Sequence, residues 1–568
     1  MPGERAPVSR MAMGRGGAAP TGTRRELPQG ASAYVVSSLL RANLVVAAGT
    51  ALSRLTGLLR VMVLAAVIGK AALGDLYRIG NETPNIVYEL LLGGVLSASL
   101  VPLFTSFNEK DDDESTNAVI TVASVALLVI TAVALIAAPL VFRIYSINVS
   151  GEVDADSFRR AGTMLTRIFL IQILFYGLTA LVSALLNSRR RFFAASWSPV
   201  LANVITIAAL LSLPDAGDAG DAGDAGDGGW SYLRVLDNTR LRLTLGLGAT
   251  VGIVAMALTL VVAVRRTGFS FRPVWNLKHP AVRKLAIMSG WTLGYVVANQ
   301  ASVAVVRNLA DPGSGDTSAY FDAYTFFVLP HGLLAVSIAT TFIPEMAQAV
   351  ARRDRGTFVD RTSLGIRLVS LLTLPAGILM FVLRRSIVGA LLQHGEYSSA
   401  DADITARALA GFALGLCAFS VYLFVLRGFY AHHDTRTPFL INVGENLLNI
   451  VLAVILVRRY DVMGLGASFA LAYAIAAVWA LAVLAGKVHT FPLREVFSSL
   501  ARMLVAGALG GEAAWVVARN VGGNVGIGGA VRFSVAGLAG IVAYVIALLA
   551  LRAPEVNAIR RRVLPGGA

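Results

Sequence analysis

The chain has 568 residues, of which 56% are hydrophobic and 15% are charged, whereas about 25% of the residues in a soluble domain are charged. Apolar runs of about 20 residues recur along almost the whole sequence, which excludes an ordinary soluble enzyme and indicates an all-α polytopic membrane protein. The formal net charge of +15 does not indicate nucleic-acid binding, because most lysines and arginines stand in short clusters between apolar runs, as topology signals do.

Fourteen segments are predicted to cross the membrane as helices, because each can span a hydrocarbon layer of about 30 Å. Residues 1–33, rich in Gly, Ala, Pro and Arg, are predicted to form a disordered cytoplasmic tail, and residues 552–568 a second tail. The predicted helices are 42–69, 76–104, 117–142, 161–187, 193–213, 242–264, 283–309, 319–347, 363–383, 402–430, 437–457, 462–486, 495–518 and 527–551.

The basic residues predict that both termini are cytoplasmic. Lysine and arginine are retained preferentially inside, and a cytoplasmic N-terminus places roughly 28 of them inside against roughly 13 outside. The acidic low-complexity loop 214–229 then lies outside. We interpret this loop as flexible rather than as a calcium site, because the turn-and-strand context of calcium repeats is missing.

Two short motifs recur at nearly the same spacing in the two halves of the chain. Pro-x-Leu-x-Asn occurs at 199–203 and again at 438–442, and a Pro ends the similar stretches 99–102 and 341–344. The repeats predict two six-helix lobes, an N-lobe (34–264) and a C-lobe (265–486), followed by a helix pair within 487–551. Because six is even, the lobes are parallel repeats, an architecture typical of alternating-access transporters.

Charged residues in the first predicted helix suggest an anion site. At 100° per residue, Arg54 and Arg60 lie about 60° to either side of Gly57, and Ser53 precedes them. Arginine forks suit phosphate oxygens, so these residues are candidates for binding a polyanionic headgroup. The alternative is an arginine pair with a structural or snorkelling role.

The second predicted helix carries candidates for a gate. Asp75 and Arg78 stand near its start, and Pro84 followed by Asn85 permits a bend beside charged residues. Arg78 is a further candidate for binding the headgroup if it faces inward. Asp75 has an alternative role as an acid favoured by the dipole at the helix N-terminus.

A polar cluster in the eleventh predicted helix is a candidate ion site for Na⁺ or H⁺. Asn442 and Asn446 share one helix face, as do Glu445 and Asn449. Hydrogen bonding between helices is the alternative role of this cluster. Arg307, near the outer end of the seventh predicted helix, is expected to snorkel to the membrane surface.

Motifs of soluble catalytic chemistry are missing from the sequence. No Gly-x-x-x-x-Gly-Lys-Ser/Thr loop occurs, the six histidines form no ligand pattern, and Cys417 is the only cysteine. We therefore expect no cofactor, no metal and no enzyme activity. An enzyme acting within the membrane is an alternative, because a few charged residues at its surface can suffice for catalysis.

Over residues 42–551 the sequence resembles the MurJ (MviN) family of lipid II flippases, in the multidrug/oligosaccharidyl-lipid/polysaccharide (MOP) exporter superfamily. The resemblance depends on five motifs in order. They are Ser53-Arg54-x-x-Gly57-x-x-Arg60, Gly74-Asp75 with Pro84-Asn85, Leu96-Ser97-x-x-Leu100-Val101-Pro102, Leu185-Leu186-Asn187-x-Arg189-Arg190-Arg191-Phe192 and Phe429-Tyr430-x-x-x-Asp434-Thr435-Arg436-Thr437-Pro438.

The resemblance implies fourteen helices, with a final pair that extends a groove for a lipid tail. It implies a flippase of the bacterial plasma membrane that moves the undecaprenyl-pyrophosphate-linked muropeptide (lipid II) outward for peptidoglycan synthesis. Arg54 and Arg60 would contact the headgroup, Asp75 would form a gate or pair with them, and Pro84 and Asn85 would shape the cavity. Membrane lipids and proteins of cell-wall synthesis or division are the implied partners.

Departures from the family pattern at three positions bear on which substrate the resemblance implies. Positions that are often basic in the family hold Tyr88 and Thr325, and an often acidic position holds Val61. The cavity is therefore expected to be less cationic than usual. An exporter of another polyprenyl-linked polysaccharide, or of drugs or cations, is the alternative function within the superfamily.

Overall fold

The computed structural model describes residues 29–90, 100–213, 230–432, 434–488 and 490–555, in which every regular element is a helix. The acidic loop and most of both predicted tails lie outside these ranges. The helices of the first half are α1 (Gln29–Ile68), α2 (Ala72–Leu90), α3 (Val101–Asn108), α4 (Asp113–Ile136), α5 (Ala138–Ile144), α6 (Ala155–Leu170), α7 (Gln172–Ser188), α8 (Phe192–Leu211), α9 (Arg234–Asp237) and α10 (Thr239–Arg265).

The second half contains α11 (Pro280–Leu309), α12 (Asp316–Pro330), a π turn (His331–Ala335), α13 (Val336–Ala351), α14 (Arg355–Leu391), α15 (Ser399–Ala413), α16 (Leu416–Ala431), α17 (Arg436–Val488), α18 (Leu493–Asn520) and α19 (Gly526–Ala550). Every predicted segment overlaps one or more of these helices, and residues 91–99 of the predicted segment 76–104 lie outside the described residues. The first helix begins at Gln29, so its start falls within the predicted tail 1–33.

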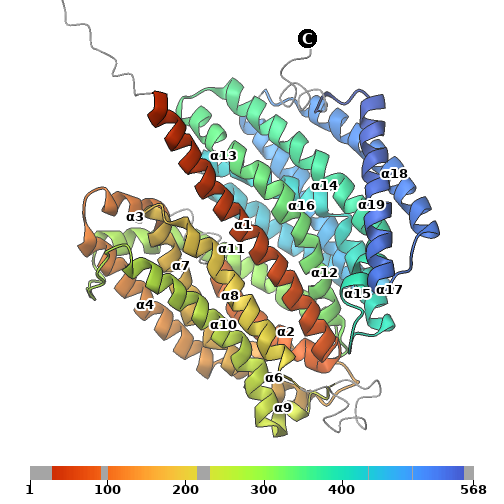
Figure 1. Ribbon diagram of the computed structural model, residues 1–568, viewed down its shortest axis with the longest axis horizontal. Helices are drawn as coiled ribbons and strands as arrows, with labels where there is room; N and C mark the ends of the chain where they lie inside the picture. Colours follow the sequence, from red (N-terminus) through yellow and green to blue (C-terminus); the bar gives the residue numbers. More distant parts are fainter. Residues whose placement is uncertain (1–28, 91–99, 214–229, 433, 489, 556–568) are drawn as a thin grey trace, which may run out of the picture.

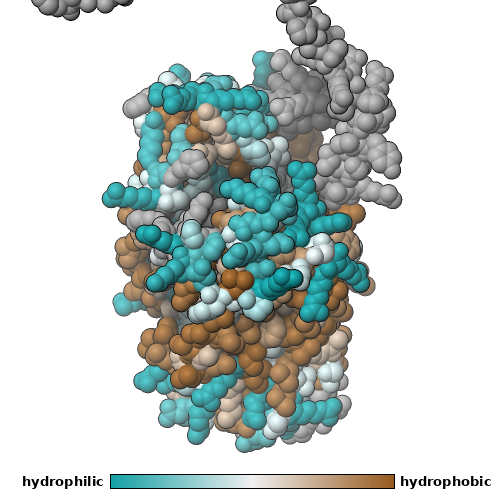
Figure 2. Space-filling view, turned by 90° about the vertical axis from the view of Figure 1, so that its left-hand side faces the viewer, coloured by the Kyte–Doolittle hydropathy of each residue, from teal (hydrophilic) through white to brown (hydrophobic). Residues whose placement is uncertain are grey.

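The chain is a multi-pass membrane protein. Within the described residues, ten helices are long and apolar enough to cross a membrane, or eleven if the bent pair α15 and α16 forms one span. Helices α2 and α11 are not among them, and the side chains of part of each helix lie outside the described residues. Figure 2 shows hydrophobic side chains gathered in a band on one face, with hydrophilic side chains on both sides of it. The number fourteen stays a prediction.

The 53-residue helix α17 is two helices joined at a kink. Asp461 has a left-handed backbone with φ of 48°, and the chain beyond it folds back along the first arm. Asn449 accepts a hydrogen bond from Ser468 at 3.0 Å, and a Cβ on Gly444 would lie 2.6 Å from the Trp479 ring. The two arms therefore match the separate predicted segments 437–457 and 462–486.

The helices of the two halves gather on either side of α1. In Figure 1, α3 to α10 lie on one side of this helix and α12 to α19 on the other. Helix α1 packs along α8, where Trp197 Nε1 donates a hydrogen bond to the Val45 carbonyl at 3.1 Å. Helices α18 and α19 pack on each other and on α14, around a small core that includes Met503 and Tyr544.

Backbone details repeat between the halves at the spacing of the sequence motifs. Left-handed residues follow α1 and α11 at Gly69 and Asp311, and precede α4 and α14 at Asp111 and Arg353. The next residue in the second set caps each helix: Asp112 accepts from the Ser115 amide at 2.9 Å, and Asp354 from the Thr357 amide at 3.0 Å. These pairs lie 242 positions apart, which supports the predicted pseudo-repeat.

The same caps hold the carboxylates in their charged form. Hydrogen bonds from the Ser115 side chain and amide lower the pKa of Asp112, and the equivalent bonds from Thr357 lower the pKa of Asp354. A charged carboxylate at a helix N-terminus also interacts favourably with the helix dipole.

Close packing of α15 against α17 leads to a stability prediction. A Cβ on Gly466 would lie 2.7 Å from the Ala408 carbonyl oxygen, so we expect Gly466→Ala to destabilise the protein by about 1–3 kcal/mol through overpacking. Thermal unfolding in detergent measures the effect. The control is Gly486→Ala, where the added Cβ meets nothing within 4 Å and where we expect no loss. Equal losses in both variants would contradict the packing argument.

Candidate functional site

A cavity of about 940 Å³ lies between the two halves and brings together most of the predicted site residues. Its walls come from α1, α2, α7, α8, α11, α12 and α17. The predicted residues that line it are Ser53, Arg54, Gly57, Arg60, Arg78, Asn85, Glu445, Asn446 and Asn449. Asp75, Pro84 and Asn442 do not line it, although they lie on the same helices.

Helix α1 presents two arginines to this cavity. Arg54 is exposed and Arg60 is half-buried, and neither forms an ion pair with a described acidic residue. Gly57 stands between them, close to Asn203 of α8. The Asn203 amide donates to the Ser53 carbonyl at 3.2 Å and to the Thr56 hydroxyl at 3.0 Å. The α8 contact thus fixes this turn of α1 while leaving both guanidinium groups available to an anion.

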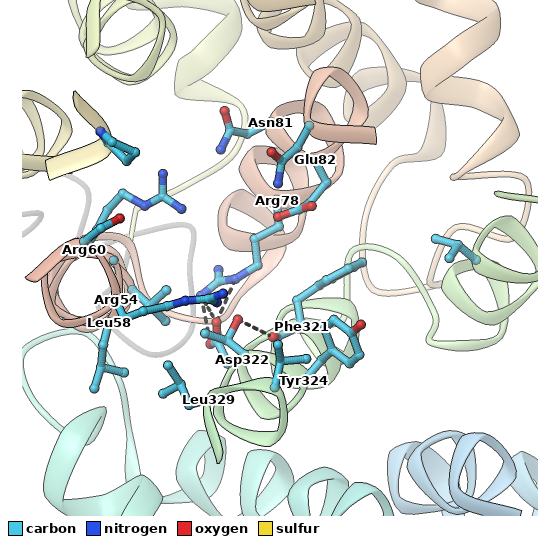
Figure 3. A pocket seen from close by; sticks show the side chains of 18 of the residues that line it. Arg54, Leu58, Arg60, Arg78, Asn81, Glu82, Phe321, Asp322, Tyr324 and Leu329 are labelled. Carbon is cyan, nitrogen blue, oxygen red and sulfur yellow. Dashed lines mark hydrogen bonds and ion pairs between the residues drawn. The ribbon is translucent and has the colours of Figure 1, made fainter. Parts of the chain in front are cut away.

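Arg78 is already neutralised by an acid of the other half. Its guanidinium nitrogens donate to both carboxylate oxygens of Asp322 on α12, at 2.8 and 2.9 Å for Nη2 and 3.1 Å for Nε (Figure 3). Both side chains are buried. Arg78 does face inward as hypothesised, but its charge is compensated by Asp322, so in this structure it adds little to the cationic character of the cavity.

Asp75 holds the loop before α12 rather than an arginine of α1. The fully buried carboxylate accepts hydrogen bonds from the amides of Gly313 at 2.9 Å, Gly315 at 3.0 Å and Ser318 at 2.7 Å. The Ser318 hydroxyl donates a fourth, at 2.6 Å. The expected pairing of Asp75 with Arg54 and Arg60 is not present. Its negative charge instead meets the amide-rich start of a helix, where anions are favoured.

Further contacts join the two halves near Asp75 and Arg78, and together these contacts close one end of the cavity. Buried Lys70, between α1 and α2, pairs with Asp316 at 3.2 Å and approaches Asp401 at 3.9 Å. The Glu396 amide donates to the Ala66 carbonyl at 2.9 Å. From this closure the cavity lining extends along α1, α7 and α8 to Val46, Asn187 and Phe192.

Arg307 does not snorkel as expected. It is buried in the cavity wall, with its guanidinium carbon 4.5 Å from the ring centres of both Tyr145 and Phe321. Two of its nitrogens have no hydrogen-bond partner among the described residues. Stacking between two aromatic rings retains this cation inside the protein, and sequence alone did not indicate it because the rings come from distant elements.

The asparagines of the polar cluster on α17 form hydrogen bonds between helices, which is the alternative role that the sequence left open for them. The side-chain oxygen Oδ1 of Asn299 on α11 accepts from the side-chain amides of Asn442 at 3.0 Å and Asn446 at 2.8 Å, and the Asn449 side-chain amide donates to the Ser302 hydroxyl at 3.1 Å. These are hydrogen bonds between helices. Glu445 differs, because it is buried at the cavity and its Oε2 has no described hydrogen-bond partner.

The departures from the family pattern lie on α1, α2 and α12, and Val61 of α1 lines the cavity. Helix α2 continues through Pro84 to residue 90, and the side chain of Tyr88 lies outside the described residues. Thr325 lines the cavity and donates a hydrogen bond to the Phe321 carbonyl of its own helix. Within the described ranges, no three His, Cys, Asp or Glu side chains are grouped so as to hold a metal ion.

Comparison with known proteins defines the family. The model of the family described as lipid II flippase MurJ matches residues 64–535. The chain belongs to the MurJ family. A MurJ relative from Vibrio cholerae, named a probable lipid II flippase, is 26% identical over 491 residues, which cover 84% of this chain and 88% of the relative. The lipid II flippase MurJ of Burkholderia cenocepacia is 28% identical, with coverage of 72% and 76%.

Solved structures share the fold. A lipid II flippase MurJ in an inward closed conformation has a TM-score of 0.71 and 21% identity, and the match covers 92% of this chain and all of that one. An inward-facing MATE-family multidrug transporter of the MOP superfamily has a TM-score of 0.61 at 11% identity, with coverage of 77% and 94%. The MurJ architecture is therefore shared with transporters whose names describe other cargo.

The buried pair between α2 and α12 leads to a double-variant prediction. Arg78→Ala or Asp322→Ala leaves an uncompensated buried charge, so each should destabilise the protein by about 3–5 kcal/mol. The double variant should lose less than the sum of the two, because both charges are gone. Thermal unfolding in detergent measures these losses.

The matched control is the more exposed pair of Arg361 and Glu345, 3.1 Å apart. Removing either of these side chains should cost about 0–1 kcal/mol. Additive losses for Arg78 and Asp322 would contradict the coupling inferred from their geometry.

Proposed function

We propose that this chain flips lipid II from the inner to the outer leaflet of the bacterial plasma membrane, without chemical change to the lipid. One observation carries the proposal beyond family membership. The cavity between the two halves exposes Arg54 and Arg60 with no described acidic partner, while the arginine opposite them, Arg78, is neutralised by Asp322. Two unpaired guanidinium groups on one helix face suit a diphosphate, because each can donate two parallel hydrogen bonds to phosphate oxygens.

The closed end of the cavity supports an alternating-access mechanism. We place both termini in the cytoplasm, so the closure formed by Lys70, Asp75, Arg78 and their partners faces outward. The headgroup would then bind from the inner side in this state. Outward opening would separate α2 from α12 and from the loop before it, which breaks the hydrogen bonds to Asp75 and the pair of Arg78 with Asp322.

The membrane potential and an ion are the proposed energy sources. The potential favours outward movement of an anionic headgroup by about 2.3 kcal/mol per charge at 100 mV. The empty carrier must then return, and Glu445 is the candidate for carrying Na⁺ or H⁺ because it is a buried cavity acid whose Oε2 has no described hydrogen-bond partner. The neighbouring asparagines already use amide groups in bonds between helices, which leaves the carboxylate as the titratable member of the cluster.

Removal of one cavity cation tests the function. In cells depleted of this protein, we expect outer-leaflet lipid II to disappear, to return with the unaltered chain, and to remain at least tenfold lower with Arg54→Ala, because losing a charged hydrogen-bond donor costs about 1.5–3 kcal/mol. Leaflet accessibility of the lipid is measured at matched protein levels.

The matched control is Arg143→Ala, which removes an exposed arginine that does not line the cavity and should leave flipping intact. Persistence of outer-leaflet lipid II after depletion, in cells with no other flippase, would refute the proposed substrate. Full rescue by Arg54→Ala would refute the anion site but would leave the proposed substrate standing.

Replacement of the candidate ion carrier tests coupling. In proteoliposomes with imposed Na⁺ or H⁺ gradients, Glu445→Gln should abolish the ion dependence of net flipping but retain exchange of lipid for lipid, because exchange does not require return of the empty carrier. Glu345→Gln, at a partly exposed acid of α13, is the control. Unchanged ion dependence in Glu445→Gln would show that Glu445 does not carry the coupling ion.

A further inference from the structure

A second large cavity lies on the other side of α1, away from the central one. Its volume is about 1020 Å³, and it is formed by α1, α8, α10 and the short turn before α8. Val46 and Phe192 line both cavities, so α1 and the start of α8 form the wall between them. None of the roles proposed above uses this second cavity.

The lining of the second cavity is divided between charge and apolar surface. Arg190, Arg191 and Arg266 are exposed at one end of it, and no described acidic side chain pairs with them. The neighbouring Arg189 does pair, with Asp113 at 3.4 Å. The remaining lining is mostly aromatic or aliphatic and includes the exposed side chains Phe192, Phe193, Leu201, Leu258 and Val262.

The position of these groups fits one lipid molecule. The three arginines stand at the start of α8 and the end of α10, where the sequence predicts the cytoplasmic membrane surface. Phe193 and Trp197 stack one turn further along α8, with ring centres 5.6 Å apart, and the aliphatic residues continue into the hydrocarbon layer. A headgroup phosphate at the arginines therefore places an acyl chain along the apolar lining.

The wall between the two cavities is closely packed, which argues against passage of the transported lipid from one cavity to the other. Helix α1 packs closely along α8, and the hydrogen bonds of Trp197 and Asn203 fasten it there. A Cβ on Gly49 would lie only 2.6 Å from the Trp197 ring. An occupant of the second cavity would support the outer side of α1, the helix that carries Arg54 and Arg60, without reaching them.

We propose that this second cavity is a binding site for an anionic phospholipid of the inner leaflet, held by Arg190, Arg191 and Arg266 and by the apolar surface beside Trp197. The occupant is a bound membrane lipid rather than the cargo. The site is separate from the headgroup site proposed above, and its test depends on binding rather than on transport.

Bromine-labelled acyl chains, which quench nearby tryptophans, test the site in the full-length protein. Vesicles contain brominated phosphatidylglycerol or brominated phosphatidylcholine, and the signal of interest is the quenching that Trp197→Phe removes. We expect phosphatidylglycerol to quench this component more strongly. Because one arginine near an anionic headgroup changes binding roughly fivefold, Arg190→Gln, Arg191→Gln and Arg266→Gln together should abolish the preference.

A variant with the same loss of charge controls for general electrostatics. Arg265→Gln, Arg352→Gln and Arg353→Gln together remove three exposed arginines that do not line the cavity, and the preference should persist. Native mass spectrometry of purified protein provides a second measurement, retained phosphatidylglycerol per chain, that does not depend on the Trp197→Phe variant.

Two outcomes would overturn the proposal. Equal quenching by the two lipids, or equal loss of preference in the two triple variants, would show that the arginines do not form an anionic lipid site. Displacement of the bound phosphatidylglycerol by stoichiometric lipid II would show that the cavity binds the cargo instead.

Discussion

Charge buried between helices must be neutralised, and in this protein the neutralising groups lie across the boundary between the two halves. Asp75 and Arg78 belong to α2, while their partners belong to α12 and to the loop that precedes it. Neither half alone provides partners for both of these charges. A separated α2 would expose a carboxylate and a guanidinium to the hydrocarbon layer or to an open cavity. The geometry of the cavity depends on this constraint, since the contacts that close one end also fix the positions of α1 and α2.

The arginines of the central cavity are kept inside the membrane in three different ways. Arg78 is paired with a carboxylate, Arg307 is stacked between two aromatic rings, and Arg54 and Arg60 have neither arrangement. The protein itself supplies the carboxylate for Arg78 and the two rings for Arg307, although two nitrogens of Arg307 have no described hydrogen-bond partner. The cost of holding the last two in the membrane is recovered only when water or a ligand reaches them, which is why their environment points to an anionic cargo.

The sequence predicted the features that depend on local periodicity and failed on those that depend on distant partners. Apolar runs located the helices, and the 100° rotation per residue placed Arg54, Gly57 and Arg60 on one face, as the cavity lining has them. The partners of Asp75 include backbone amides about 240 positions away, and backbone groups leave no mark in a sequence. The sequence places Arg307 at the membrane surface, because a single arginine near a helix end has the same local pattern whether it snorkels or is stacked between rings from distant elements.

The repeated backbone positions have a consequence for the closure itself. With a spacing of about 242 residues, α12 is the counterpart of α2, so two equivalent helices meet where the halves touch. In an assembly of two identical halves, each ion pair across such an axis would be made twice. Here the positions symmetric to Arg78 and Asp322 hold Tyr320 and Gly80, so the pair is made once. A single pair separates at a smaller cost than two, which favours a carrier that must open and close in every cycle.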